Sequence, residues 1–170
     1  MPTDRRSGPR VPPRWFVRSF WSVHRAVYRV TGGHLGLWRP NRKKWGALSL
    51  TTTGRRSGRE RGVIIGYFED GPNYVSMAMN GWSPGEPAWW LNLQAHPDAV
   101  VDVGAGRIAV KGRAATGDER ARLWSTFQDL DGDLDAYEAL RGQETAVVVL
   151  EPCPVPPRDQ SMTSDRGRTA

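Results

Sequence analysis

A basic, glycine-rich segment at residues 54–61 has the residue types and spacing that could bind an anion. It reads Gly-Arg-Arg-Ser-Gly-Arg-Glu-Arg and lies between two short apolar runs. Glycine allows sharp turns that direct backbone N–H groups toward a ligand, and arginine offers paired donors for phosphate or carboxylate. The segment therefore predicts an anion-binding turn between two strands, although such a run of charges can also be a solvated surface turn. Its spacing fits neither a Walker loop nor a dinucleotide-binding glycine motif.

A second segment, at residues 76–93, could accommodate a flat ring. Small and thioether side chains, from Ser76 to Met79, run into a glycine- and proline-rich loop, and a short helix with paired tryptophans follows. Small side chains let a ring approach the backbone, and the indole of Trp89 or Trp90 could stack against it. The alternative is that both indoles simply fill the core.

Residues for acid–base, nucleophilic or metal chemistry are not clustered in the sequence. The histidines, His24, His34 and His96, are scattered, and no pair has the spacing of a zinc site. The single cysteine, Cys153, lies between two prolines and excludes an internal disulfide. We therefore expect no metal. If the protein is an enzyme, a bound cofactor carries the chemistry and the protein supplies position and charge.

Length and charge limit the class of protein. The 170 residues suit one domain with terminal tails, and a formal net charge of +6 indicates anionic partners. Nucleic acid is not expected, because the arginines are divided among a tail, a helix and a turn without a recognised reading motif. No apolar run approaches the ~20 residues that span a bilayer, and no secretory signal is evident, so we expect a cytoplasmic location.

An amphipathic helix is predicted at residues 13–31, after a polar tail at residues 1–12 that we expect to be disordered. Its apolar positions recur at intervals of four and three: Phe16, Phe20, Val23, Val27 and Val30. Arginines flank that face: Arg14, Arg18, Arg25 and Arg29. The helix could pack on the domain. Alternatively, the surface from Arg14 to Val30 could contact an anionic membrane, which would place the protein at the inner face of the cell membrane.

The middle of the chain is rich in short strands. Strands are predicted at residues 47–52, 61–68, 74–79, 99–103, 107–113 and 145–150, and helices at residues 87–95, 116–127 and 133–140. The order lacks the regular strand–helix alternation of a doubly wound parallel sheet. It favours a mainly β fold with short helices, in which a small, mostly antiparallel barrel occupies residues 45–152. The remaining residues, 153–170, are expected to form a disordered tail.

Three segments together resemble one family. Residues 51–58, 87–97 and 147–152 are similar to the deazaflavin-dependent nitroreductases, also described as quinone reductases dependent on coenzyme F420. The segments occur in the family's order, within a resemblance that runs from Trp45 to Pro152. The resemblance implies a split β-barrel of the flavin-reductase and FMN-binding kind. It also implies the reduced form of coenzyme F420 as cofactor, with FMN less favoured, and this cofactor has an anionic tail of phosphate and oligoglutamate.

The resemblance also implies which residues contact the cofactor. The phosphate and acidic tail would be held by Arg55, Arg56, Ser57 and Arg61. The strand beside the cofactor would contribute Gly62, Val63, Ile64, Ile65 and Gly66. The strand end near the deazaflavin ring would contribute Met77, Ala78, Met79 and Asn80. The start of the following helix would contribute Ala88, Trp89, Trp90, Leu91 and Asn92.

The chemistry that the resemblance implies is hydride transfer to a quinone such as menaquinone, or to a nitroaromatic acceptor. Tyr137 is the candidate to assist the acceptor. Leu134 is expected on the substrate side, where nitro-reducing relatives have a tyrosine, so this chain lacks one donor for nitro reduction. The alternative is a non-catalytic split-barrel module that binds F420, FMN or another anionic hydrophobic ligand. A monomer is favoured over a dimer.

Overall fold

The computed structural model of the chain describes residues 36–41, 44–81, 83–130 and 132–154. The predicted amphipathic helix at residues 13–31, its membrane contact and the predicted tail at residues 1–12 lie outside the described residues. Most of the predicted tail at residues 153–170 lies outside them too. None of the helices in the described ranges has both the length and the apolar character needed to cross a membrane.

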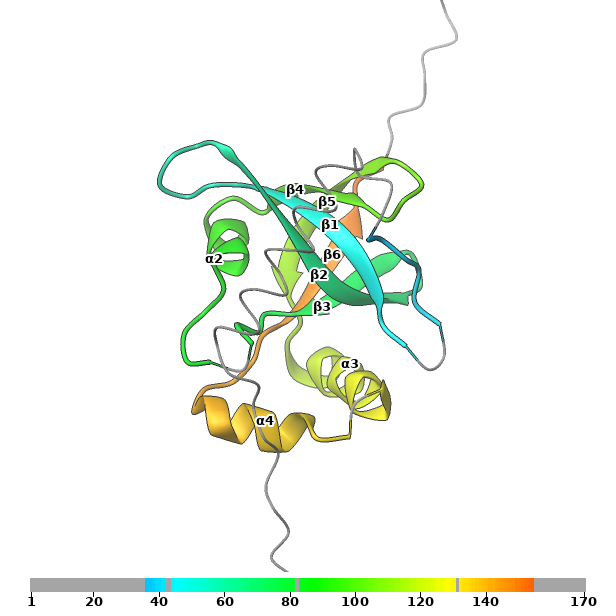
Figure 1. Cartoon of the computed structure of the whole chain (residues 1–170), viewed down its shortest axis with the longest axis vertical. Coiled ribbons are helices and arrows are strands. Elements are labelled where there is room, and N and C mark those ends of the chain that lie inside the picture. The colour runs from blue at the N-terminus through cyan, green and yellow to red at the C-terminus, as the bar shows by residue number, and fades with distance from the viewer. Residues whose placement is uncertain (1–35, 42–43, 82, 131, 155–170) are drawn as a thin grey trace, which may run out of the picture.

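A closed barrel of strands forms the centre of the described chain (Figure 1). The strands are β1 (Gly46–Thr53), β2 (Glu60–Asp70), β3 (Asn73–Met77), β4 (Asp98–Asp102), β5 (Arg107–Ala114) and β6 (Val147–Pro152). Their order around the barrel is β1-β2-β3-β6-β5-β4, and every neighbouring pair is antiparallel. Closure leaves none of these six strands with an unpaired edge. The mainly β, antiparallel barrel that the sequence predicts is therefore confirmed.

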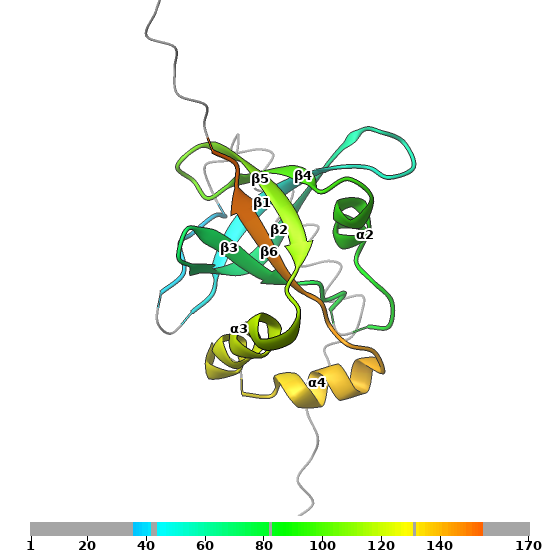
Figure 2. The ribbon, with the colours of Figure 1, turned by 180° about the vertical axis from the view of Figure 1, so that it is seen from behind.

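Short helices cover the barrel at two places. These helices are α2 (Ala88–Ala95), α3 (Gly117–Leu130) and α4 (Leu134–Arg141). Figures 1 and 2 show α2 beside the barrel, close to the projecting hairpin between β1 and β2, whereas α3 and α4 lie together at one end. Because α2 and the β1–β2 hairpin come from distant parts of the sequence, the barrel brings the two predicted ligand-binding segments together.

The strands and helices predicted within residues 45–152 all appear, with small changes at their ends. Strand β6 spans Val147–Pro152, where residues 145–150 were predicted, and β3 ends at Met77 and not at Met79 as predicted. The chain turns there, because the Met79 N–H donates to the Met77 carbonyl (2.8 Å), and the Ala78 N–H donates to the Ala146 carbonyl (2.8 Å). Residues that were expected to continue the strand therefore form the entrance to a loop.

The register between β1 and β2 explains the inner core. Leu48 lies opposite Ile65, and Leu50 lies opposite Val63, so these side chains share one face of the hairpin. The apolar residues of this face belong to, or pack against, a core cluster that also contains Trp89, Trp90 and Leu93 of α2. The register of the two strands thus determines which of their side chains fill the inner core.

A second core cluster joins the barrel to α3 and α4. The ring of Phe127 packs against Phe68 at 4.6 Å and against Trp45 at 5.2 Å between ring centroids. Leu134, the first residue of α4, is fully buried in the same cluster. These contacts hold α3, and through Leu134 the start of α4, against the barrel.

Candidate functional site

A cavity of about 670 Å³ lies between the β1–β2 turn, β2, the end of β3 and the start of α2. Most of the residues predicted to bind a ligand line it. From the basic turn and β2 these are Arg55, Arg56, Ser57, Arg61, Gly62, Val63, Ile64, Ile65 and Gly66; from β3 and α2 they are Met77, Met79, Asn80, Ala88, Trp89 and Asn92. The fold thus gathers two distant sequence segments around one space.

The basic turn is held in shape by its own backbone. The Gly54 N–H donates to the Arg59 carbonyl (2.8 Å), and the Gly58 N–H donates to the Gly54 carbonyl (2.8 Å). Gly58 adopts a φ of 63°, a left-handed conformation that favours glycine. A Cβ added to Gly54 would lie 3.0 Å from both the Arg59 carbonyl and the Ser57 hydroxyl. The glycines therefore permit a tight turn with exposed arginine side chains.

A buried polar network connects this turn to α2. Asn92, which is 5% exposed, accepts hydrogen bonds at Oδ1 from the Arg55 backbone N–H (3.1 Å) and from Arg55 Nη1 (3.4 Å). Asn92 Nδ2 donates to the hydroxyl of Thr52 (3.1 Å), which in turn donates to the Arg61 carbonyl (3.4 Å). Asn92 was predicted as a cofactor contact, and the structure shows that it also fixes the position of the turn.

Beyond the basic turn, most of the side chains that line the cavity are apolar, and this part is called the apolar end below. Val63 and Ile65 line it from β2, Met77 and Met79 from the end of β3, and Trp89 from α2. Trp89 packs edge-on against Trp90, with ring centroids 6.4 Å apart. Where β2 leaves the basic turn, a Cβ added to Gly62 would meet no atom within 4 Å, so a ligand can approach the backbone there. This end suits a flat, largely apolar ring.

Three residues of the predicted cofactor set lie outside the cavity lining. Ala78 is fully buried and belongs to the inner core cluster. Trp90 is 5% exposed and belongs to the same cluster, so it fills the core while its neighbour Trp89 faces both core and cavity. Leu91 is partly buried and does not line the cavity. Ala78 and Trp90 are thus used for core packing, and neighbouring residues on the α2 helix point in different directions, so Leu91 need not share the cavity side of Trp89.

The residues expected on the substrate side also lie elsewhere. Leu134 is fully buried against the second core cluster, where it packs between α3 and the barrel. Tyr137 is half-buried on α4 and does not line the cavity. The described structure therefore gives Leu134 a packing role, and it does not bring the Tyr137 side chain to the cavity wall.

Several cavity residues were not predicted from the sequence. The lining also includes Thr52, Gly54, Ser76, Gly81, Ser83 and Pro87. The strand register could have identified Thr52, because it lies opposite Arg61 on the same face of the hairpin. Ser76 is nearly fully buried, and its hydroxyl donates to the Gly66 carbonyl (2.8 Å). This hydrogen bond joins β3 to β2 beside the cavity.

The donor set fits an elongated ligand with an anionic end and a flat apolar end. Arg55, Arg56 and Arg61 form no ion pair with an acidic side chain among the described residues, so their charges are available to a ligand. The described lining contains no carboxylate, imidazole, thiol or phenol. In the part of the chain that the structure describes, the cavity thus offers charge, hydrogen bonds and shape, which is what a protein supplies when a cofactor carries the reaction.

Comparison with known proteins agrees with this geometry. Residues 21–152 match the family model described as F420H(2)-dependent quinone reductase. An F420H(2)-dependent quinone reductase of Mycobacterium tuberculosis is 31% identical over 144 residues, which cover 81% of this chain and 95% of that relative. A solved F420-H2 dependent reductase (FDR-A) is 26% identical, with a TM-score of 0.57, and covers 68% of this chain and 100% of its own. A structure described as a domain-swapped dimer is 26% identical, with a TM-score of 0.60, covering 82% of this chain and 100% of its own.

Proposed function

We propose that the cavity is a cofactor site, because the chain belongs to the F420H(2)-dependent quinone reductase family. The protein is an F420-dependent oxidoreductase that acts on quinones, and reduced coenzyme F420 is its cofactor. The observation that supports this cofactor site is that one cavity combines guanidinium groups, which form no ion pair among the described residues, with an apolar lining.

The basic turn would hold the anionic part of the cofactor. Arg55, Arg56 and Arg61 each carry a fixed positive charge, and the Ser57 hydroxyl adds a neutral donor beside them. Charge-assisted hydrogen bonds are roughly twice as strong as neutral ones. The tail of F420, which carries phosphate and glutamate carboxylates, matches this donor set, whereas FMN carries only a phosphate.

The apolar end would orient the ring and the acceptor. Reduced coenzyme F420 supplies a hydride when bound, and a quinone that gains this hydride and one proton becomes a hydroquinone. Met77, Met79 and Trp89 would exclude water from the face where the acceptor stacks. Since the described lining has no acidic group, we expect solvent to provide the proton. A menaquinone-like quinone is favoured over a nitroaromatic acceptor, because the family model and the mycobacterial relative are described as quinone reductases.

The function can be tested by mixing the full chain with reduced F420 and a water-soluble menaquinone analogue. Oxidation of the cofactor is followed by its absorbance, and a nitroaromatic compound is run in parallel. We expect rapid oxidation with the quinone and slow or no oxidation with the nitroaromatic compound. Tight cofactor binding without turnover on any quinone would instead favour a non-catalytic module that sequesters the cofactor.

Contact with a membrane is a separate proposal, because a menaquinone-like acceptor resides in the lipid phase. The segment from Arg14 to Val30 lies outside the described residues, and its sequence predicts an amphipathic helix with an apolar face flanked by arginines. Such helices bind anionic lipid surfaces through charge and partial burial. Co-sedimentation of the full chain with anionic vesicles, but not with zwitterionic ones, is expected. Equal sedimentation with both, or with neither, would contradict the proposal.

A further inference from the structure

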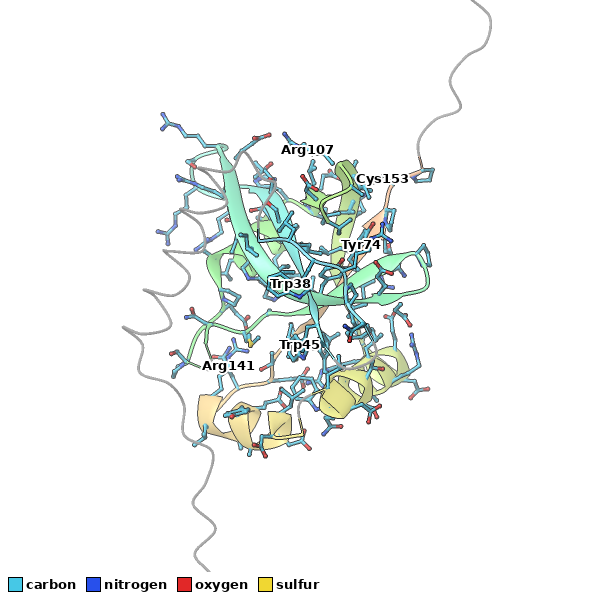
Figure 3. The ribbon with its side chains drawn as sticks, turned by 45° about the vertical axis from the view of Figure 1, so that its right-hand side comes forward. Trp38, Trp45, Tyr74, Arg107, Arg141 and Cys153 are labelled. Atoms are coloured by element: carbon cyan, nitrogen blue, oxygen red, sulfur yellow. The ribbon has the colours of Figure 1, made fainter. Side chains whose placement is uncertain are left out.

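The segment that precedes α2 is held from the far side by the end of α4. Both backbone groups of Gly85 are used: its N–H donates to Gln143 Oε1 (3.1 Å), and its carbonyl accepts from Arg141 Nη2 (2.9 Å). Gly85 has a φ of 87°. Figure 3 shows the Arg141 side chain between α4 and this segment. Two residues near the end of α4 thus fix one residue of a loop that has no regular secondary structure.

The same group of side chains also holds the next residue of the loop. Gln143 Nε2 donates to Glu86 Oε1 (2.8 Å), and Arg141 Nη2 lies 3.4 Å from Glu86 Oε2. Arg141 also donates from Nη1 to the Thr145 hydroxyl (2.8 Å). The residues Arg141, Gln143, Gly85 and Glu86 are called the loop clamp below.

The composition of the loop clamp is unusual for a contact that serves stability alone. The Arg141 side chain is fully buried, whereas that of Glu86 is 25% exposed. Among the described residues, Arg141 Nε and Glu86 Oε2 are buried atoms without a hydrogen-bond partner. A buried ion pair with unsatisfied atoms often contributes less to stability than apolar residues of the same volume. The clamp is better explained by the geometry that it imposes on the loop.

That geometry reaches the cavity directly. Ser83 and Pro87, on either side of the clamped residues, both line the cavity. The Pro87 carbonyl accepts hydrogen bonds from the Trp90 N–H (3.1 Å) and the Leu91 N–H (3.2 Å), so the position of Pro87 sets where α2 begins. One turn further along, α2 presents Asn92, which holds the basic turn. Contacts therefore run without interruption from α4 through α2 to the anion-binding end.

We propose that Arg141 and Gln143 are positioning residues of the cofactor cavity. By holding the loop before α2, they fix the start of α2 and with it the separation between the apolar end and the basic turn. This inference rests on the proposed function, because it takes the cavity to be the F420 site. It assigns a role in binding to two residues that do not themselves line the cavity.

The test compares Gln143→Ala with the wild-type chain by amide hydrogen exchange, without cofactor, and by F420 titration. Gln143 is chosen because it is half-buried and its truncation removes two hydrogen bonds without burying a bare charge. We expect faster exchange of the Gly85 amide and F420 affinity weakened about five- to tenfold, the size expected for one ordinary hydrogen bond. Arg141→Lys keeps the positive charge but cannot donate from two guanidinium nitrogens at once. It should also speed exchange of the Gly85 amide and weaken F420 affinity.

Arg122→Ala is the matched control, because it also removes two hydrogen bonds, to Asp70, but at residues outside the cavity lining. It should change neither the exchange of the Gly85 amide nor the F420 affinity. The inference is overturned if Gln143→Ala leaves F420 affinity unchanged, whether or not exchange accelerates. It is also overturned if Arg122→Ala weakens binding equally. A failure of the proposed function looks different: the wild-type chain would not bind F420, and the exchange comparison would still report whether the clamp orders the loop.

Discussion

The arginines of the basic turn and the arginines around α3 are used in opposite ways. Arg113 donates to both Glu119 oxygens (2.6 and 2.8 Å) and to Glu151 Oε1 (2.8 Å), and Arg122 forms a bidentate pair with Asp70. By contrast, the turn arginines have no acidic partner among the described residues. Among the described residues, arginine charge is therefore neutralised where it joins elements of the fold and is not ion-paired at the proposed cofactor site.

The ion pairs of Arg113 and Arg122, called the paired region below, lower the pKa values of their carboxylate partners. The basic turn, whose arginines have no acidic partner among the described residues, is called the unpaired region. The Arg113 guanidinium holds the pKa of the Glu119 carboxyl below its ordinary value through hydrogen bonds. In the same way, Arg122 lowers the pKa of Asp70. These contacts join β5, β6, α3 and the end of β2. Glu119 lies in the first turn of α3 and binds Arg113 through both carboxylate oxygens.

The largest effect is expected when the unpaired region loses two charges. In the double variant Arg55→Ala and Arg56→Ala, F420 binding should weaken by roughly a hundredfold or more, since each charge-assisted contact contributes ~1.5–3 kcal/mol. The free energy of unfolding should stay within ~0.5 kcal/mol of wild type, because both side chains are exposed. Fluorescence titration and denaturant unfolding measure the two quantities. An equal loss of affinity in Arg122→Ala would remove the distinction between the two groups of arginines.

A smaller effect is expected when the support of the turn is removed. Asn92→Ala deletes three hydrogen bonds at a nearly buried position, so the free energy of unfolding should fall by ~1–3 kcal/mol. F420 affinity should weaken about tenfold because Arg55 is no longer held. Gln94→Ala, at an exposed position on the same helix, is the control and should change neither quantity. Retained affinity in Asn92→Ala would mean that the turn keeps its shape without α2.

Salt should weaken binding through the unpaired region. Raising the ionic strength from about 0.1 M to about 1 M shortens the screening length from about 10 Å to about 3 Å. We expect wild-type F420 affinity to fall severalfold over this range, with a shallower dependence in the Arg55→Ala and Arg56→Ala variant. Titrations at a series of salt concentrations provide both slopes. Identical slopes would show that these arginines do not act on the cofactor through charge.

The smallest effect concerns pH and the paired region. A carboxyl whose pKa is lower in the folded state stabilises the fold above its unfolded pKa, and this contribution is lost as the pH falls through the folded value. For Asp70, whose ordinary pKa is 3.8, the loss begins below about pH 4. The stability difference between wild type and Asp70→Asn should therefore shrink as the pH drops from 6 to about 3. Thermal unfolding across this range measures the difference, and a constant difference would contradict the assigned role of Arg122.

The sequence was sufficient where the determining signal is local. Gly54, Gly58 and the adjacent arginines predict a tight basic turn because glycine conformation and charge are properties of a few neighbouring residues. The strands themselves were predicted from local apolar runs bounded by turn residues, whereas their order around the barrel was not predicted, because helices separate β3 from β4 and β5 from β6. The roles of Trp89 and Trp90 could not be separated in this way, since adjacent residues at the start of a short helix differ only by the packing around them.

Contacts between distant residues were beyond the reach of local patterns. The loop clamp joins Gly85 to Gln143, which are 58 residues apart, through polar side chains with no period or motif. Leu134 was placed at the substrate by its position in the family pattern, whereas the buried surface of α3 and the barrel determines where its side chain lies. Tertiary packing determines both the loop clamp and the position of the Leu134 side chain, so neither could be predicted from local sequence patterns.

Titration of the wild-type chain and of the Arg55→Ala and Arg56→Ala variant with coenzyme F420 tests the central claim most directly. Intrinsic tryptophan fluorescence provides the signal, since Trp89 lines the cavity, and FMN is titrated in parallel. The account predicts tight F420 binding and weak FMN binding by the wild-type chain, with F420 affinity lost in the variant. F420 affinity that is equal in the two proteins would contradict the assignment of the basic turn and its cavity as the cofactor site.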